Sequence, residues 1–234
     1  MKNKILSLDW QKIGQSLHEV GFAHLPALLT ETQCQELRDQ FHCEVGYRKT
    51  VEMARYRFGR GCYKYWDYPL PGLVENLRKE LYPHLVPVAN DWMEKLGLEQ
   101  RYPNELCDFI ETCYHAGQNK PTPLILEYAK GGYNTLHQDL YGEVYFPIQV
   151  ACFLSQPERD YCGGEFVLTE QIPRAQSKVT VLKPNLGDLI IFATNFKPMK
   201  GIRGYYQAKM RHGVSQVHEG HRYAMGIIFH DALK

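Results

Sequence analysis

The stretch after Pro121 constrains the fold more than any other part of this sequence. It contains seven short runs rich in β-branched and aromatic residues, separated by turn residues: 124–128, 144–154, 165–168, 178–182, 189–192, 213–217 and 223–229. Such runs are typical of strands. Because helices do not alternate with them, the pattern excludes a parallel α/β sheet and predicts a β-sandwich or barrel.

The first 120 residues have a different pattern, mostly that of helices. Apolar residues recur at helical spacing in four places: 9–20, 30–41, 69–97 with a break at Pro83, and from Pro103 to about Gly117. Thr30 and Gln33 form a capping box at the start of the second helix. The extended segments 22–26 and 48–53 are candidates to join the sheets. We predict one domain over residues 1–234, with 1–120 as helical support and substrate-side elements and 121–234 as the core.

Composition excludes several classes of protein. The net charge of +1 gives no global attraction to a polyanion. The N-terminus has no apolar run long enough for a signal peptide or a membrane span, so we expect a cytoplasmic protein without a membrane partner. The seven cysteines are odd in number and contain no Cys-x-x-Cys pair, which argues against a disulfide framework and a zinc knuckle.

One pair of polar residues points to a metal. His137 and Asp139 are two residues apart, and in an extended chain this spacing puts both side chains on one face. With 10 histidines and 26 acidic residues in 234, about one such pair is expected by chance. The chain has two, because His42 and Glu44 have the same spacing. We propose His212 as the third ligand, which completes the two-histidine, one-carboxylate set of non-heme iron(II) oxygenases.

The order of landmarks distinguishes the two pairs. His137-x-Asp139 is followed by Gly163-Gly164-Glu165-Phe166, by Gly187-Asp188 before an apolar run, by His212, and by Arg222 ten residues later. This order resembles the Fe(II)/2-oxoglutarate dioxygenases over roughly residues 124–231, whereas no such series follows His42. The resemblance implies a double-stranded β-helix core of the jelly-roll, cupin-like kind. We interpret the glycines as turn residues and Asp188 as structural.

The resemblance also implies the chemistry. Fe(II) held by His137, Asp139 and His212 leaves three adjacent positions open, of which 2-oxoglutarate fills two and dioxygen the third. Arg222 is our candidate for the far carboxylate of 2-oxoglutarate, since a guanidinium binds a carboxylate bidentately. Many relatives carry Ser or Thr two residues after this arginine. Here that residue is Ala224, and we assign the missing hydrogen bond to Tyr128. The expected outcome is hydroxylation or oxidative demethylation.

The substrate is less constrained. Residues 47–68 mix basic and aromatic side chains, which suits a flat or anionic substrate, although packed arginine stems and tyrosines explain the same pattern. Substrate-binding candidates within this stretch are Met53, Arg55, Arg60, Tyr63 and Tyr65. The run from Phe196 to His218 contains five basic residues and no acid.

The sequence also resembles particular families of oxygenases. Residues 126–139 resemble AlkB-type nucleic-acid dealkylases. The whole chain, including Gly59-Arg60-Gly61-Cys62-Tyr63-Lys64-Tyr65 and Pro69-Leu70-Pro71, resembles a bacterial oxygenase family assigned to damaged DNA. Leu126 departs from the asparagine usual in AlkB-type enzymes, and the short interval from His212 to Arg222 is like that of prolyl hydroxylases. Three hypotheses remain: a dealkylase of nucleic acid, a hydroxylase of a protein side chain or small metabolite, and a metal-binding barrel without turnover.

Overall fold

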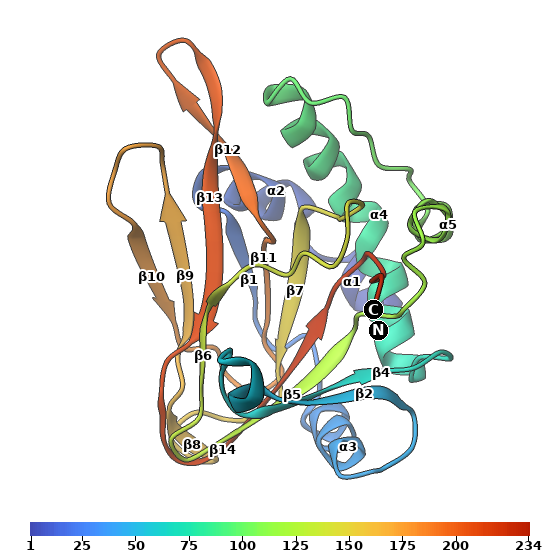
Figure 1. Ribbon diagram of the computed structural model, residues 1–234, viewed down its shortest axis with the longest axis vertical. Coiled ribbons are helices and arrows are strands. Elements are labelled where there is room, and N and C mark those ends of the chain that lie inside the picture. The colour runs from blue at the N-terminus through green and yellow to red at the C-terminus, as the bar shows by residue number, and fades with distance from the viewer.

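The computed structural model describes residues 1–234 and contains two antiparallel sheets that face each other (Figure 1). The larger sheet is built, in spatial order, from β1 (Phe22–Leu25), β11 (Leu189–Ala193), β7 (Ile148–Phe153), β14 (Val217–Ile227), β5 (Leu124–Ala129), β4 (Cys62–Trp66) and β2 (Tyr47–Glu52), with β8 (Tyr161–Gly163) paired to β14. The smaller sheet is built from β10 (Lys178–Leu182), β9 (Phe166–Gln171), β13 (Gly204–Val214), β6 (Tyr133–His137) and β3 (Gly59–Arg60), with β12 (Phe196–Gly201) paired to β13. The predicted jelly-roll core with flanking helices is confirmed.

Helices cover the outer face of the larger sheet (Figure 1). They are α1 (Lys2–Leu6), α2 (Trp10–Val20), α3 (Glu31–Phe41), α4 (Gly72–Lys95) and α5 (Leu106–His115), and the short 3-10 helix η1 (Met53–Tyr56) lies beside β6. A core of 39 buried residues fills the space between these helices and the sheet. Alternation along β7 sends Ile148, Val150 and Cys152 into this core and the residues between them into the barrel interior. The sheet therefore has one face for stability and one for the site.

The helical predictions need two corrections. The break at Pro83 is wrong, because α4 continues through Pro83 and Pro87 as one helix of 24 residues. An internal proline costs about 3 kcal/mol, but α4 buries ten side chains, among them Leu81, Leu85 and Trp92, and this packing outweighs the cost. In addition, α5 begins at Leu106 rather than at Pro103.

Most of the predicted runs contain a strand, but the run 213–217 is wrong as a single strand. It spans the end of β13, a two-residue link and the start of β14. The prediction also missed most of β13 together with β6, β8 and β12, where polar residues, a short length and Pro198, respectively, hide the pattern. Residues 1–120 also supply four strands, two of which form the edge next to β5. The capping box at Thr30 is present, and all seven cysteines are free thiols. Gly163, Gly164 and Gly187 have positive φ, as expected for turns. No helix has the length and apolar character needed to cross a membrane.

A buried ion pair joins α4 to the end of β14. Arg78 and Asp231 are 2.7 Å apart, and their side chains are 3% and 2% exposed. The same guanidinium donates to the carbonyls of Ile228 and Phe229 at 3.0 and 2.8 Å. Removal of one member of such a pair leaves a buried charge without a partner.

We therefore expect Arg78→Met to lower the free energy of unfolding by about 3–5 kcal/mol. Urea denaturation followed by circular dichroism measures this quantity. Lys79→Met, on the exposed side of the same helix, is the matched control and should change it by less than about 0.5 kcal/mol. Equal stability of the two variants would contradict the structural role of the pair.

Candidate metal centre

Strand pairing brings the two histidines together. His137 is the last residue of β6, and His212 lies directly opposite it on β13. Cross-strand neighbours on one face are close enough for their side chains to touch, and the centroids of the two rings are 4.1 Å apart. The pairing explains why residues so distant in sequence share one site.

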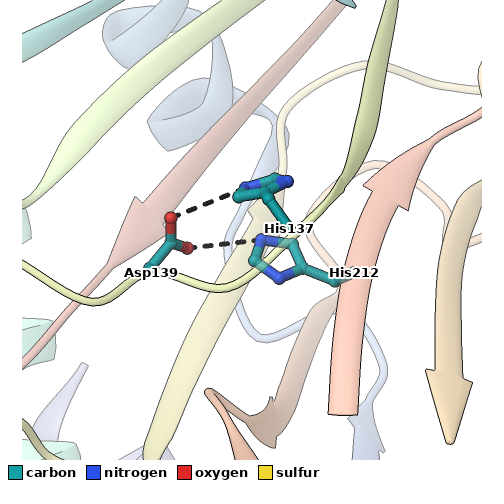
Figure 2. A group of neighbouring side chains, drawn as sticks. All are labelled: His137, Asp139 and His212. Atoms are coloured by element: carbon teal, nitrogen blue, oxygen red, sulfur yellow. Dashed lines mark ion pairs between the residues drawn. The ribbon is translucent and has the colours of Figure 1, made fainter. Parts of the chain in front are cut away.

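Asp139 completes the cluster from the turn after β6 (Figure 2). Its Oδ1 is 3.5 Å from Nε2 of His137, and its Oδ2 is 3.3 Å from Nε2 of His212. One ligand atom from each of the three residues lies within 4.8 Å of the others, and this is the one such group of His, Cys, Asp or Glu in the chain. The three candidate ligands are thus brought together, whereas His42 is elsewhere, with its Nε2 3.3 Å from the hydroxyl of Tyr223.

Hydrogen bonds orient the candidate ligands. Nδ1 of His137 donates to the carbonyl of Thr135 at 2.8 Å, which fixes the tautomer and leaves the Nε2 lone pair facing the cluster. The amide of Gln138 donates to the carbonyls of Asn195 and Met210, both at 2.8 Å, and so holds the turn between the ligands against β13. This donor set and its orientation fit Fe(II).

The charges of the cluster are strongly coupled. Burial would raise the pKa of Asp139, but the adjacent imidazoles of His212 and His137 hold it well below its usual value. Burial lowers the pKa of His212, and His137 adds to this effect. Burial also disfavours protonated His137, yet Asp139 outweighs it and raises the pKa of His137. The carboxylate is therefore ionised at neutral pH, as a metal ligand must be.

Two tyrosines connect Asp139 to the substrate side. The hydroxyl of Tyr141 donates to Oδ1 of Asp139 at 2.9 Å, and the hydroxyl of Tyr65 donates to that of Tyr141 at 3.1 Å. Burial, together with the negative charge of Asp139, raises the pKa of Tyr141 well above its usual value, so this hydroxyl stays protonated and remains a donor. Such contacts fix the orientation of a ligating carboxylate.

A cavity of about 220 Å³ opens beside the cluster. Arg222, on β14, lines it and is only 2% exposed. The guanidinium lies 5.5 Å from the ring centroids of Tyr128 and Phe153, and its Nε and Nη1 have no hydrogen-bond partner. A buried cation without a partner is costly, so this end of the cavity is suited to an anion.

Tyr128 stands beside Arg222 in the strand register. Its hydroxyl accepts a hydrogen bond from the amide of Asn134 at 3.2 Å, and its own proton remains free to donate. Burial raises the pKa of Tyr128 to about 12. Arg222 and Tyr128 are therefore cross-strand neighbours that both line the cavity, and their binding of a carboxylate stays a prediction.

The substrate-side candidates separate into two groups. Tyr63 and Tyr65 line the cavity. Met53 is fully buried in a cluster with Tyr128 and does not reach the cavity, while Arg55 and Arg60 are exposed on the outer surface. Sequence reasoning missed several polar cavity residues, among them Asn134, Tyr141 and Gln149. Tyr141 and Gln149 belong to no motif, and only their position in the fold could have indicated them.

Comparisons with known proteins agree with this geometry. Residues 61–232 match a family described as oxygenases catalysing oxidative methylation of damaged DNA. The chain belongs to this oxygenase family. Uncharacterized proteins from two strains of Mycobacterium tuberculosis are each 48% identical over 164 residues, which is 70% of this chain and 70% of theirs.

Solved structures show the same fold. A 2OG-Fe(II) oxygenase-family oxidoreductase from Burkholderia pseudomallei has a TM-score of 0.58 and 16% identity, and the match covers 97% of this chain and 94% of that one. A prolyl-4-hydroxylase from Pseudomonas putida has a TM-score of 0.56 and 12% identity, with 94% and 97% covered. The family model thus identifies an oxygenase, and the solved structures share its fold. The His-Asp-His cluster is a candidate site for its metal.

The geometry predicts which histidine matters for metal affinity. His212→Ala should weaken binding of Co(II), measured by its visible absorption, by more than the roughly 10- to 100-fold typical of outer-shell changes, because a ligand itself is lost. His42→Ala should bind Co(II) as the wild type does. Equal affinity of the two variants would show that the metal binds elsewhere.

Proposed function

We propose that His137, Asp139 and His212 bind Fe(II), that Arg222 and Tyr128 bind the far carboxylate of 2-oxoglutarate, and that the substrate is an alkylated base in DNA. One observation carries the assignment of the site: the buried cation Arg222, which has no acidic partner and two N–H groups without an acceptor, lies in the cavity that also contains the His-Asp-His cluster. A cosubstrate with a carboxylate at each end suits both features at once.

The chain's own residues order this reaction. When bound, the iron and dioxygen oxidise 2-oxoglutarate to succinate and carbon dioxide and insert one oxygen atom into a C–H bond of the substrate. Arg222 neutralises the far carboxylate, and Tyr128 donates to it. Phe153, Phe166 and Phe192 line the interior and exclude water, which strengthens these polar contacts. Tyr141 keeps Asp139 in one orientation throughout.

The product depends on the atom that bears the oxidised carbon. A methyl group on a ring nitrogen becomes hydroxymethyl, and the C–N bond then breaks, with the carbon lost as formaldehyde and the proton returned to nitrogen. The net result is removal of the methyl group from the base. This outcome agrees with the damaged DNA named in the family description.

The surface next to the cavity favours nucleic acid. Tyr56 and Phe58 stack with centroids 5.5 Å apart and are 54% and 46% exposed. The carbonyl of Phe58 accepts from the backbone N–H of Thr135 at 2.9 Å, which places this pair against β6 near the metal cluster. Exposed aromatic rings beside cations suit stacked bases and a phosphate backbone. Arg57 is exposed on the same segment, as are Arg55 and Arg60.

The β12–β13 hairpin supplies further positive charge. Lys200, Arg203, Lys209 and Arg211 are exposed along it. Lys197, which the sequence groups with them, is 1% exposed and pairs with Glu170 at 3.0 Å, so it is not available to a phosphate. Arg211 precedes His212 on β13, and alternation turns its side chain to the outside.

Removal of the positive charge of Arg222 tests its proposed role. Arg222→Gln should raise the KM for 2-oxoglutarate by about 100-fold, which corresponds to about 3 kcal/mol, because the carboxylate loses a charged partner. Initial rates of succinate formation measure it. Arg203→Gln, on the hairpin surface, is the control and should leave this KM unchanged. A normal KM in Arg222→Gln would exclude the assigned role.

The substrate is tested with single-stranded oligonucleotides that contain 1-methyladenine or 3-methylcytosine. Formaldehyde and succinate should appear in equal amounts, and binding should weaken steeply with salt, because phosphate contacts release counterions. The double variant Lys209→Gln/Arg211→Gln should bind with a smaller salt slope. Succinate formation without any release of formaldehyde from DNA would instead favour a protein or metabolite hydroxylase, and absence of all succinate would favour a barrel without turnover.

A further inference from the structure

The cavity contains a second buried polar side chain without a partner. Gln149 on β7 is 2% exposed and lines the cavity, and neither its Oε1 nor its Nε2 has a hydrogen-bond partner. An amide carries both a donor and an acceptor, whichever way it is oriented. A buried amide without partners destabilises the folded protein. Two unpartnered atoms on one side chain therefore indicate a ligand that offers both an acceptor and a donor.

The strand register places Gln149 at the end of the cavity away from Arg222. Ile227 on β14 pairs with Val150, so Gln149 is next to Ile228, which lies six residues beyond Arg222. At about 3.3 Å per residue, six residues span roughly 20 Å along the strand. Gln149 also pairs with Phe192, whose ring centroid is 4.9 Å from that of His212. It thus lies on the metal side of the cavity.

The cosubstrate cannot satisfy this side chain. At neutral pH 2-oxoglutarate has two carboxylates and a keto oxygen, all of which are acceptors, so it offers nothing to Oε1 of Gln149. Dioxygen has no donor either. The far carboxylate already has Arg222 and Tyr128 as partners. What remains is the substrate, which must carry a donor beside an acceptor.

The surroundings of Gln149 are flat and aromatic. Ile228 packs with Tyr65 and Leu124, and Tyr63 and Tyr141 are packed against the same cluster. Tyr65 and Tyr141 direct their hydroxyls toward each other and toward Asp139, which leaves their rings as the wall of this part of the cavity. A planar ring with one polar edge fits between such a wall and an amide.

We propose that Gln149 is a specificity-determining residue that binds the amine and acceptor edge of a planar heterocycle in the substrate. This inference rests on the proposed function and deepens it, because adenine carries its exocyclic amine beside the ring acceptor N7, and methylation at N1 leaves N7 free. Glutamine pairs with such an edge through two parallel hydrogen bonds, as it does with adenine in duplex DNA. A base turned out of the strand would enter the cavity with this edge toward Gln149.

The test compares a nucleoside with an apolar ring. The protein is loaded with Mn(II) and N-oxalylglycine, and dissociation constants are measured for 1-methyladenosine and N-methylindole. Gln149→Met has a side chain of similar length without the amide. It should bind 1-methyladenosine at least roughly tenfold more weakly than the wild type, since a bidentate pair contributes about 1–3 kcal/mol. Its affinity for N-methylindole and its KM for 2-oxoglutarate should not change.

Two further measurements separate this role from a structural one. Gln149→Met should unfold at the same or a higher temperature than the wild type, because it removes an unpartnered buried amide. Gln149→Asn keeps the amide but is one methylene shorter, and should also lose nucleoside affinity. The inference is overturned if Gln149→Met binds 1-methyladenosine as the wild type does, if the wild type binds it no better than N-methylindole, or if the 2-oxoglutarate KM rises in parallel.

The outcome is independent of the DNA assignment. Nucleoside binding that depends on Gln149, without formaldehyde release from oligonucleotides, would support the role of Gln149 and contradict DNA as the substrate. Formaldehyde release from oligonucleotides at the same kcat/KM in wild type and Gln149→Met would support DNA as the substrate and contradict the role of Gln149.

Discussion

The antiparallel pairing of β6 with β13 is the constraint on which the site depends. It sets His137 opposite His212, and the register shifts immediately afterwards, between His212 and Val214. A slip of one residue would turn one histidine to the outer face, because side chains alternate along a strand. β13 also pairs with β9 through Leu168, so its position is fixed from both sides. The metal cluster is a consequence of register, with Asp139 added from the turn that follows.

The larger sheet holds two buried polar side chains that lower the stability of the fold. Arg222 and Gln149 project from it into the barrel without partners, and each destabilises the folded chain. The core packed on its outer face supplies the stability that such groups remove. Rigid support also prevents these side chains from collapsing onto each other, so their donors and acceptors stay directed at the cavity. This is the preorganisation that selective binding of a charged cosubstrate requires.

Much of this arrangement could be predicted from the sequence, where a residue type and its spacing carried the information. The β-rich runs after Pro121 indicated the barrel, and the order from His137 to Arg222 indicated the reaction class. Other features depend on tertiary packing that a local pattern does not show. Pro83 is a helix breaker by intrinsic propensity, yet α4 continues because its apolar face is buried. Polar residues such as Gln149 become informative only when burial removes their contact with water.

The substrate-side stretch shows the same limit. Residues 47–68 looked like one basic and aromatic surface, but η1 and β3 divide it. Met53 is buried in a cluster with Tyr128. Tyr63 and Tyr65 face the cavity, whereas Arg55 and Arg60 are exposed. The sequence alone could not assign these orientations, because a bend at η1 interrupts the alternation that a regular strand would impose. Composition predicted that this stretch is basic and aromatic, but the backbone geometry decides which of its side chains face the cavity and which face the solvent.

The length of the cavity follows from small residues in the middle of the larger sheet. Between Arg222 and the end that holds Gln149, β14 presents Ala224 and Gly226 to the interior, and Ala151 lies beside Gly226 on β7. A Cβ at Gly226 would already meet the side chain of Leu124 at 3.3 Å. The short side chain of Ala224 keeps this part of the cavity open between its two polar ends. Larger side chains at these three positions would leave the metal cluster intact but divide the cavity. The proposed binding of a cosubstrate and a flat substrate in one cavity therefore depends on these small residues.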